Sequence, residues 1–404
     1  MAAVADNELK MQPLTGLRIL DLTKLLPGPW STMLLGDLGA EVLKIESPYQ
    51  GGDNSRAGRP RYAGQGRSES VYFCNVNRNK RSLVLDLKKK EDRETLLSLV
   101  RDADVMIESF RPGVADRLGI GYRSVSALNP RIIYCAISGY GQTGPLKHLA
   151  GHDLNIAGMS GLLQINPDQQ PTMPNMLMGD YAGGVMALVG ILAAIAQRER
   201  KGTGSYIDVS MLDALVSWTN VQMTGVFART LDSAQTSAIE GWGGNPRYNI
   251  YKTKDGRYVT ASLLEKKYWD ALCQHCGRED LINDQETEDD RLTTHGDRGI
   301  QYRAFLTDLF LRKTRDAWVA ELQAKEIPVC PVLTPEEVFS ANTKAQRDWF
   351  FQMDLPHLGV SVPQNGFPFR MIAPDGASLL AAHRPPPALG EANGEYMLAK
   401  AWHQ

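Results

Sequence analysis

Short apolar runs alternate with longer amphipathic segments over the first half of the chain. The runs at residues 17–22, 41–46, 82–87, 105–108 and 132–137 are short and almost continuous, which predicts buried strands. Residues 30–38 and 91–102 repeat their apolar positions at helical spacing, which predicts helices between these strands. Strands that alternate with helices pair in parallel through right-handed crossovers. We therefore expect an α/β protein with a Rossmann-like, doubly wound large domain over residues 1–228.

The pattern changes after residue 228. Residues 230–246 are polar and rich in small side chains, which is typical of a linker. Two short strands around the turn at 254–256 predict a hairpin, and helical periodicity follows to about residue 326. Residues 229–335 are therefore expected to form a linker and a smaller α+β domain, and residues 336–404 return to loops and short strands.

Composition narrows the class of protein. The 404 residues are 43% hydrophobic and 22% charged, with a formal net charge of −2, so we expect no nucleic-acid partner. No apolar run reaches the roughly 18 residues that span a bilayer, and the apolar helix predicted at 185–201 ends in charged residues, so we expect no membrane partner. Five scattered cysteines favour a reducing, cytoplasmic location. Cys273 and Cys276 form a lone CxxC, and we expect no metal site there.

Two segments show little periodicity. Residues 50–72 are rich in Gly, Arg and Ser and are expected to form a long loop, which is often functional. Residues 139–144 match GxGxxG and follow a strand, but Pro145 and a polar stretch follow instead of a helix. Because the helix N-terminus that would bind phosphate is missing, we expect a loop near the active site rather than a nicotinamide site.

The candidate chemistry gathers between residues 151 and 184. His152 and Asp153 follow Gly151, and Asp180 stands before Gly183 and Gly184. An imidazole and a carboxylate on opposite sides of one carbon can remove a proton from one face and return it to the other. Such chemistry requires neither a metal nor a redox cofactor. Asp153 could instead cap the helix that follows it.

Several motifs occur in an order that resembles the family III CoA-transferases of the CaiB/BaiF type. They are the N-terminal strand–helix–strand unit, the long loop, and the segments at residues 77–82, 108–113 and 129–131. The resemblance covers roughly residues 14–380, and the superfamily also contains the α-methylacyl-CoA racemases. It implies a large domain built from both chain ends, so that residues 336–404 return to it. It also implies an interlocked homodimer, with a CoA ester lying along the large domain.

The resemblance also assigns residues. CoA would be present only as part of the acyl-CoA substrate, and no other cofactor is implied. Arg111, Lys80 and Arg81 are weaker candidates for the CoA phosphates, and for Lys80 and Arg81 a surface salt bridge is the slightly favoured interpretation. The positions that match CoA contacts, or that offer a cation to its phosphates, are Leu85, Lys88, Ser109, Phe110, Arg111 and Arg117.

Two branches of the superfamily share the position of Asp180. In transferases this carboxylate is a nucleophile that forms an acyl anhydride and then a thioester with CoA. In racemases it is one of two proton-transfer groups, and His152, in the pattern Gly-His-Asp-x-Asn, is the other. Glu265 matches the racemase glutamate that pairs with this histidine, which would raise its basicity.

The resemblance to the racemase branch therefore implies a racemase of 2-methyl-branched acyl-CoA thioesters. It would work by a two-base 1,1-proton transfer through an enolate, with His152, Asp180, Glu265 and Asp153 as catalytic residues. The alternative is a CoA-transferase with Asp180 as nucleophile. Arg247 departs from the racemase pattern and could bind a carboxylate on the substrate, which supports this alternative.

Overall fold

The computed structural model describes residues 12–164, 170–232, 243–287, 290–341, 347, 349–399 and 402. The chain divides into two compact units. Unit 1 contains residues 1–163, 171–218 and 345–404, and unit 2 contains residues 164–170 and 219–344. The boundaries therefore follow residues 218 and 344, where the sequence predicted residues 228 and 335. Helices α9 (Thr224–Arg229) and α13 (Pro335–Ser340) account for the difference, because both fall in unit 2.

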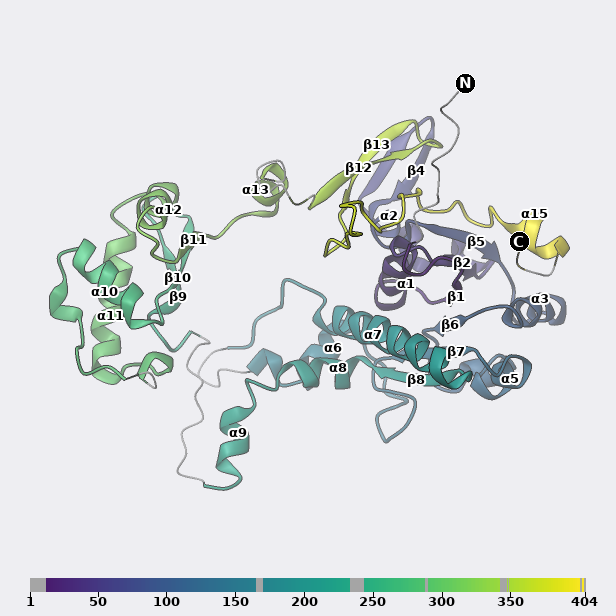
Figure 1. Ribbon diagram of the computed structural model, residues 1–404, viewed down its shortest axis with the longest axis horizontal. Helices are drawn as coiled ribbons and strands as arrows, with labels where there is room; N and C mark the ends of the chain where they lie inside the picture. The colour runs from purple at the N-terminus through teal and green to yellow at the C-terminus, as the bar shows by residue number, and fades with distance from the viewer. Residues whose placement is uncertain are drawn as a thin grey trace. The chain divides into compact units, whose positions relative to one another are not determined.

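Unit 1 is built on a six-stranded sheet in the order β5-β2-β1-β6-β7-β8, and its neighbouring strands are all parallel. From β1 the chain proceeds through β2 to β5 at one edge, then returns to β6 and continues to β8 at the other (Figure 1). This is the doubly wound order, and its switch point lies between β1 and β6. The strands are β1 (Arg18–Leu22), β2 (Glu41–Glu46), β5 (Lys80–Val84), β6 (Val105–Glu108), β7 (Ile133–Ser138) and β8 (Ser205–Ser210).

Helices cover both faces of this sheet. Alternate residues of a strand enter different cores because side chains alternate between faces. Ile19 packs in one core with Leu35 of α1 (Pro27–Asp37), and Leu20 packs in the other with Leu96 of α3 (Lys90–Val100). A sheet buried on both faces explains the continuous apolar runs of its strands. The predicted fold class, a Rossmann-like large domain with a smaller α+β domain, is confirmed.

The C-terminal part of the chain returns to unit 1. Helix α15 (Asn393–Ala399) packs against β5, and Tyr396 donates a hydrogen bond from its hydroxyl to Glu41 on β2. The buried Trp402 donates its indole N–H to the carbonyl of Leu99 at 2.9 Å. The last described residues therefore complete the core that α3 begins.

Helix α7 (Met178–Lys201) begins seven residues before the predicted helix at 185–201. Gly183 and Gly184 were expected to precede the helix, because glycine is unfavourable inside one. They lie inside it where a side chain has no room: a β-carbon on Gly184 would stand 2.9 Å from the carbonyl oxygen of Pro27. Close packing on α1 and on α8 (Met211–Trp218) therefore decides the helix start. Within the described residues, α7 is the one helix with the length and composition to cross a membrane, and one side of it packs on α1, α8 and β8 of unit 1.

One further prediction was wrong. The segment at 50–72, expected to be a loop, contains two 3₁₀ turns and an antiparallel hairpin of β3 (Arg61–Gly64) and β4 (Arg67–Ser70). The linker predicted at 230–246 lies partly outside the described residues.

Unit 2 has its own core. Its sheet has the antiparallel order β11-β10-β9, and three helices pack on it around the buried Trp269. Its elements are β9 (Tyr248–Lys252), β10 (Tyr258–Ser262), α10 (Lys266–His275), α11 (Gly296–Phe310), α12 (Arg315–Gln323) and β11 (Val329–Pro331).

Unit 1 also contains α2 (Val71–Asn77), α4 (Val114–Arg117), α5 (Tyr122–Leu128), α6 (Asp153–Met159), β12 (Phe350–Leu355) and β13 (Val360–Asn365).

Candidate active site

The candidate active site is a cleft of about 520 Å³ at the carboxyl ends of β1, β6 and β7. Ligands of doubly wound sheets bind at this end, next to the switch point. The amide of Lys24, after β1, donates to Ser109 Oγ, after β6, at 3.2 Å, so the two loops meet across the switch point. His152 and Asp180 also line the cleft. One cleft of unit 1 therefore contains the acid/base candidates and the loops that a CoA ester would contact.

Buried charges fix the loop after β1. Lys44 and Asp53 are fully buried and form an ion pair at 2.8 Å. Lys44 donates to the carbonyl of Thr23 at 2.9 Å, and Asp53 accepts from the amide of Leu25 at 3.1 Å. Leu25 has a left-handed backbone with φ of 65°, a conformation that is unfavourable for a branched side chain. The ion pair therefore holds a strained residue in the wall of the cleft.

The predicted CoA contacts gather at this cleft and its neighbour. Ser109, Phe110, Arg111 and Arg117 line the main cleft. Leu85 and Lys88 line an adjoining pocket of about 160 Å³, which also contains Lys24 and Phe110. The sequence analysis missed Lys24, although a cation directly after the central strand is a signal that could have found it. Cations from several loops therefore surround the two pockets, as an anionic ligand requires.

Lys80 and Arg81 do not reach either pocket. Lys80 is buried and donates to Asp21 at 3.0 Å and to the carbonyl of Pro29 at 2.8 Å. Arg81 forms an ion pair with Glu395 of α15. Each cation therefore has a structural partner, as the slightly favoured interpretation predicted, although Lys80 is buried rather than at the surface.

Asp180 lies in the first turn of α7, at the wall of the cleft. Its amide donates to Asp153 Oδ1 at 2.9 Å. Burial, together with the negative charge of Asp153, raises the pKa of Asp180 to about 7. Gly179 allows α7 to lie close to α6, because a β-carbon at this position would lie only 2.8 Å from the side chain of Ile156. The contact of α6 with α7 thus brings the two carboxylates together.

Asp153 has a different role from the one that the sequence suggested. It was expected either to take part in catalysis or to cap its own helix, α6. Its side chain instead accepts from the N-terminus of α7, which has no cap of its own. Asp153 is 6% exposed and is not among the residues that line the cleft. Asp153 therefore binds the backbone of Asp180, and its part in catalysis stays a prediction.

His152 directly precedes α6 and is exposed at the cleft. Its amide donates to Asn155 Oδ1 at 3.0 Å, which ties the turn to the first turn of the helix. His152 and Asp180 therefore line one cleft, although they stand 28 positions apart in the sequence. The resemblance to the racemase motif predicted that these two residues share a site. In the structure, the packing of α6 against α7 brings them to the same cleft.

Glu265 lies in unit 2, at the start of α10, where it is exposed. Its carbonyl accepts from the amide of Tyr268 at 3.0 Å, within the first turn of that helix. His152 lies in unit 1, and its pairing with Glu265 stays a prediction.

Arg247 is not available to a substrate. It is fully buried, forms an ion pair with Glu286, and donates to the carbonyls of Leu263 and Leu264, both at 2.8 Å. The expectation that it binds a substrate carboxylate was therefore wrong. It holds the chain that leads from β10 to Glu265.

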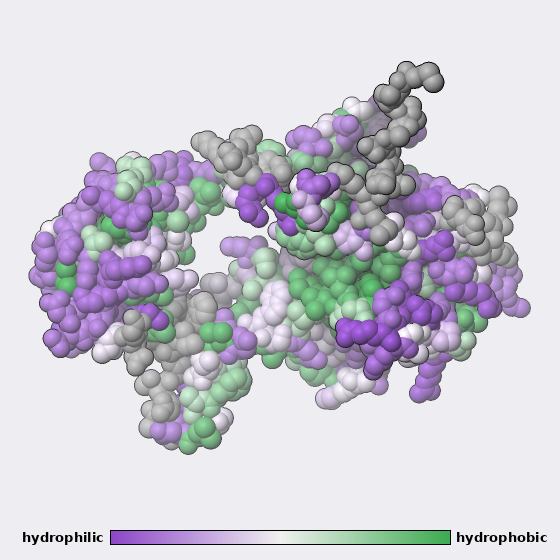
Figure 2. All heavy atoms as spheres, viewed as in Figure 1, coloured by the Kyte–Doolittle hydropathy of each residue, from purple (hydrophilic) through white to green (hydrophobic). Residues whose placement is uncertain are grey.

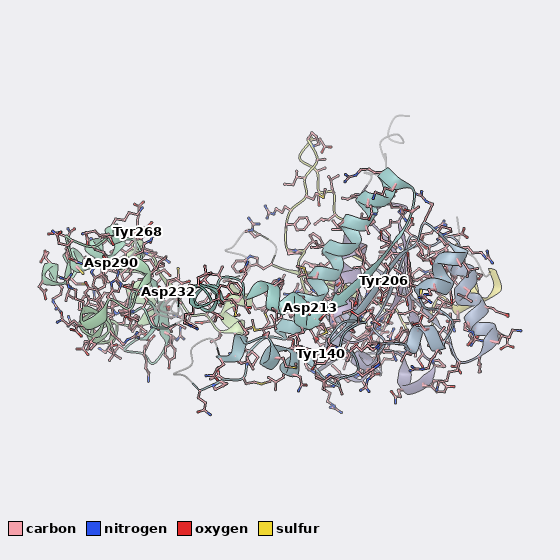
Figure 3. The ribbon with its side chains drawn as sticks, turned by 90° about the horizontal axis from the view of Figure 1, so that it is seen from below. Tyr140, Tyr206, Asp213, Asp232, Tyr268 and Asp290 are labelled. Carbon is pink, nitrogen blue, oxygen red and sulfur yellow. The ribbon has the colours of Figure 1, made fainter. Side chains whose placement is uncertain are left out.

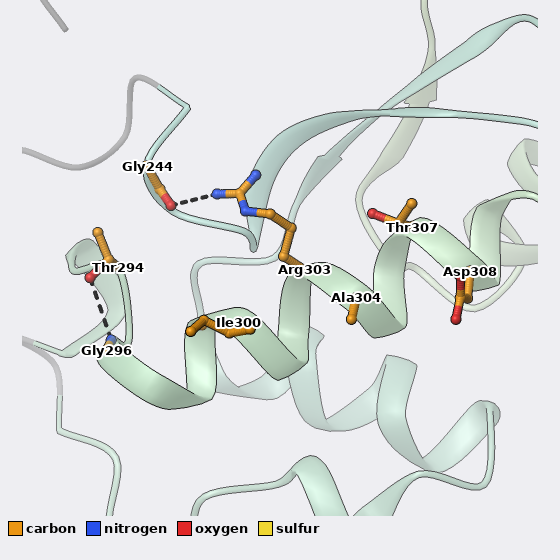
Figure 4. A pocket seen from close by; sticks show the side chains of 9 residues that line it. Gly244, Thr294, Gly296, Ile300, Arg303, Ala304, Thr307 and Asp308 are labelled. Atoms are coloured by element: carbon orange, nitrogen blue, oxygen red, sulfur yellow. Dashed lines mark hydrogen bonds between the residues drawn. The ribbon is translucent and has the colours of Figure 1, made fainter. Parts of the chain in front are cut away.

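A second cavity, of about 470 Å³, lies in unit 2 along α11 (Figure 4). Its one guanidinium group, that of Arg303, donates to the carbonyls of Gly243 and Gly244 at 3.0 and 2.7 Å. Its other lining residues are small, apolar or hydroxyl-bearing except for Asp308. This cavity therefore lacks the paired acid/base groups of the cleft in unit 1. Within the described ranges, no three His, Cys, Asp or Glu side chains are grouped as metal ligands.

Comparison with known proteins identifies the family. The model of CoA-transferase family III matches residues 14–393. The mouse succinyl-CoA:glutarate CoA-transferase is 34% identical over 386 residues, which cover 94% of this chain and 85% of that protein. This chain belongs to CoA-transferase family III.

Other members of the family agree with this assignment. The acetyl-CoA:oxalate CoA-transferase of Acetobacter aceti is 35% identical, over 87% of this chain and 88% of that protein. A crystal structure of a CAIB/BAIF family protein from Brucella suis aligns with a TM-score of 0.80 and 29% identity, covering 96% of this chain and 100% of that one. The names of these relatives support the transferase alternative over the racemase that the sequence analysis favoured.

Proposed function

We propose that this enzyme moves CoA between carboxylic acids, with Asp180 as the nucleophile. The observation that carries the proposal is the position of Asp180. Asp180 lines the same cleft as Ser109, Phe110 and Arg117, which match the CoA contacts of the family, and as Arg111, a further cation. A CoA ester bound along these loops would bring its thioester towards the carboxylate. The relatives whose names specify transferase activity support the same chemistry.

The transfer would proceed through covalent intermediates on Asp180. The carboxylate attacks the thioester carbonyl, the carbon–sulfur bond breaks, and CoA leaves as a thiolate from an acyl–aspartyl anhydride. The thiolate then attacks the aspartyl carbonyl and releases the donor acid as a carboxylate, which leaves CoA as a thioester on Asp180. An acceptor carboxylate attacks this thioester, and the returning thiolate takes the new acyl group and restores Asp180.

A covalent adduct on Asp180 tests the proposal. The protein is incubated with succinyl-CoA and analysed by mass spectrometry, and glutarate or oxalate is then added as acceptor. We expect a CoA adduct on the peptide that contains Asp180, and a new acyl-CoA after the acceptor is added. Asp180→Asn serves as the matched variant and should form neither. An Asp180→Asn protein that still transfers CoA would exclude Asp180 as the nucleophile.

Racemisation of a 2-methylacyl-CoA is the second candidate. It is favoured by one observation, which is that His152 and Asp180 line the same cleft. Proton NMR in D₂O with a 2-methylacyl-CoA and no acceptor acid separates the candidates. Loss of the α-proton signal with epimerisation, abolished in His152→Ala, would support racemisation. No exchange, together with CoA transfer once an acid is added, would support the transferase.

We also propose that the enzyme is a homodimer. Helix α7 carries exposed apolar side chains: Val189 is 52% exposed and Leu192 is 36% exposed. Figure 2 shows the hydrophobic area that covers this part of unit 1. Apolar patches of this kind mark interaction surfaces in many proteins. Light scattering should give twice the mass of 44.6 kDa, and a monomeric mass would contradict the proposal.

A cytoplasmic location is proposed on separate grounds. All five cysteines are free, and three of them are buried. Burial raises the pKa of the thiol of Cys74 to about 12. Such unpaired thiols suit a reducing compartment. Fractionation of the cells of origin would test this proposal.

A further inference from the structure

Tyr140 contributes a buried hydroxyl group to the wall of the cleft. It follows β7, is 8% exposed, and lies in unit 1 (Figure 3). Within the part of the chain that the structure describes, its hydroxyl has no hydrogen-bond partner, and neither has that of Ser138. Both residues line the cleft that contains His152 and Asp180. Two unpaired hydroxyl groups therefore lie at the end of one strand, in the lining of the cleft that contains the candidate reacting groups.

Packing alone does not explain the phenol. A buried hydroxyl without a partner costs free energy that a plain aromatic ring would avoid. The residue against Tyr140 is Gly151, where a β-carbon would lie only 2.4 Å from the phenolic oxygen. Gly151 itself lines the cleft and carries no side chain to block the hydroxyl. Gly151 thus leaves space for the Tyr140 hydroxyl, which makes no hydrogen bond to the described residues of the protein.

We propose that the Tyr140 hydroxyl donates a hydrogen bond to an oxygen of the reacting acyl group. This inference rests on the proposed CoA transfer at Asp180. When the carboxylate attacks, negative charge develops on the carbonyl oxygen of the thioester, and a fixed donor in a cleft stabilises that charge. The same donor suits the carboxylate of an acceptor acid. Ser138 lines the same cleft with a second unpaired hydroxyl group.

Tyr140→Phe tests the inference because it keeps the ring and removes only the hydroxyl. CoA transfer by the unaltered enzyme is measured first, since its absence would refute the proposed function itself. If transfer occurs, we expect Tyr140→Phe to lower kcat/KM by about tenfold to a hundredfold, the effect of losing one hydrogen bond to a charged oxygen. The melting temperature should stay the same or rise, because an unpaired buried group is removed.

Tyr396→Phe is the matched control. Its hydroxyl donates to Glu41 at 3.0 Å, away from the cleft, so its loss should lower the melting temperature and leave kcat/KM unchanged. If Tyr140→Phe retains the full kcat/KM, with or without a lower melting temperature, the inference is wrong. A fall in both kcat/KM and melting temperature would also overturn it, because that result indicates a structural role.

Two further measurements identify the oxygen. The rate at which CoA appears on Asp180 is measured in a single turnover with succinyl-CoA. A slower rate in Tyr140→Phe assigns the hydrogen bond to the thioester carbonyl. An unchanged rate with a higher KM for the acceptor acid assigns it to the acceptor carboxylate. Either pattern supports the inference, and a variant that changes neither quantity contradicts it.

Discussion

Asp180 titrates near neutral pH because of the residues around it. Burial raises its pKa to about 7, and the negative charge of Asp153 contributes in the same direction. A nucleophilic carboxylate must be ionised, and its ionised fraction increases with pH. We therefore expect kcat/KM for the donor thioester to rise through pH 7 and to level off above it. A kcat/KM that falls over this range would contradict a nucleophilic Asp180.

Asp153→Asn separates the two causes of this pKa. The amide oxygen of asparagine can still accept the N–H of Asp180, but the neighbouring negative charge is removed. The pKa of Asp180 should fall, so the midpoint of the pH–kcat/KM profile should move to lower pH. Asp153→Ala, which also removes the hydrogen bond, is the comparison and should reduce the maximal rate as well. A profile that does not move would show that burial alone sets the pKa.

A second effect at the residue scale is that the buried Lys44–Asp53 ion pair fixes the backbone of Leu25. Lys44→Met leaves the carboxylate of Asp53 buried without its cation, which should destabilise the fold by about 3–5 kcal/mol. Adding Asp53→Asn removes the uncompensated charge and should restore part of this stability. Urea unfolding measures both variants. A double variant less stable than Lys44→Met alone would show that the charge is not the cause.

At the scale of elements, glycines determine where α7 packs. A β-carbon on Gly184 would lie 2.9 Å from the Pro27 carbonyl and 3.2 Å from the ring of Trp30. Gly184→Ala should therefore push α7 from α1 and lower the free energy of unfolding by about 1–3 kcal/mol. Because α7 also carries Asp180, the rate of CoA transfer should fall with it.

Gly158 in α6 is the matched control for this substitution. A β-carbon there meets no atom within 4 Å, so Gly158→Ala should gain helix propensity and stabilise the fold by about 0.5–1 kcal/mol. Thermal unfolding compares the two variants. If both substitutions destabilise the protein equally, close packing is not the reason for the glycine at 184.

At the scale of the whole molecule, the exposed face of α7 is the surface to test. Val189→Arg places a charge in the apolar area and should shift a dimer towards the monomer in sedimentation. Ala127→Arg, at an exposed position of α5, is the control and should leave the mass unchanged. A Val189→Arg protein that sediments like the unaltered protein would place the dimer interface elsewhere.

The sequence by itself determined the doubly wound sheet and the identity of the candidate residues. Strands such as 105–108 are apolar on both faces because helices cover both sides, so local pattern and fold agree. The motifs also named His152, Asp180 and the six positions that line the two pockets. The strands are predicted by short-range hydrophobic patterns, whereas the six positions follow from the resemblance to the family.

Tertiary structure alone decided which of these groups are free to act. Local sequence does not show that Arg247 meets Glu286, that Lys80 meets Asp21, or that Asp153 caps α7, because these partners lie 27 to 59 positions apart. The start of α7 was mispredicted for the same reason, since packing against α1 outweighs the low helix propensity of Gly183 and Gly184. Contacts between segments far apart in the sequence determine which side chains are buried and which charged groups form ion pairs. Burial and ion pairing then determine the charge of each side chain and whether a ligand can reach it.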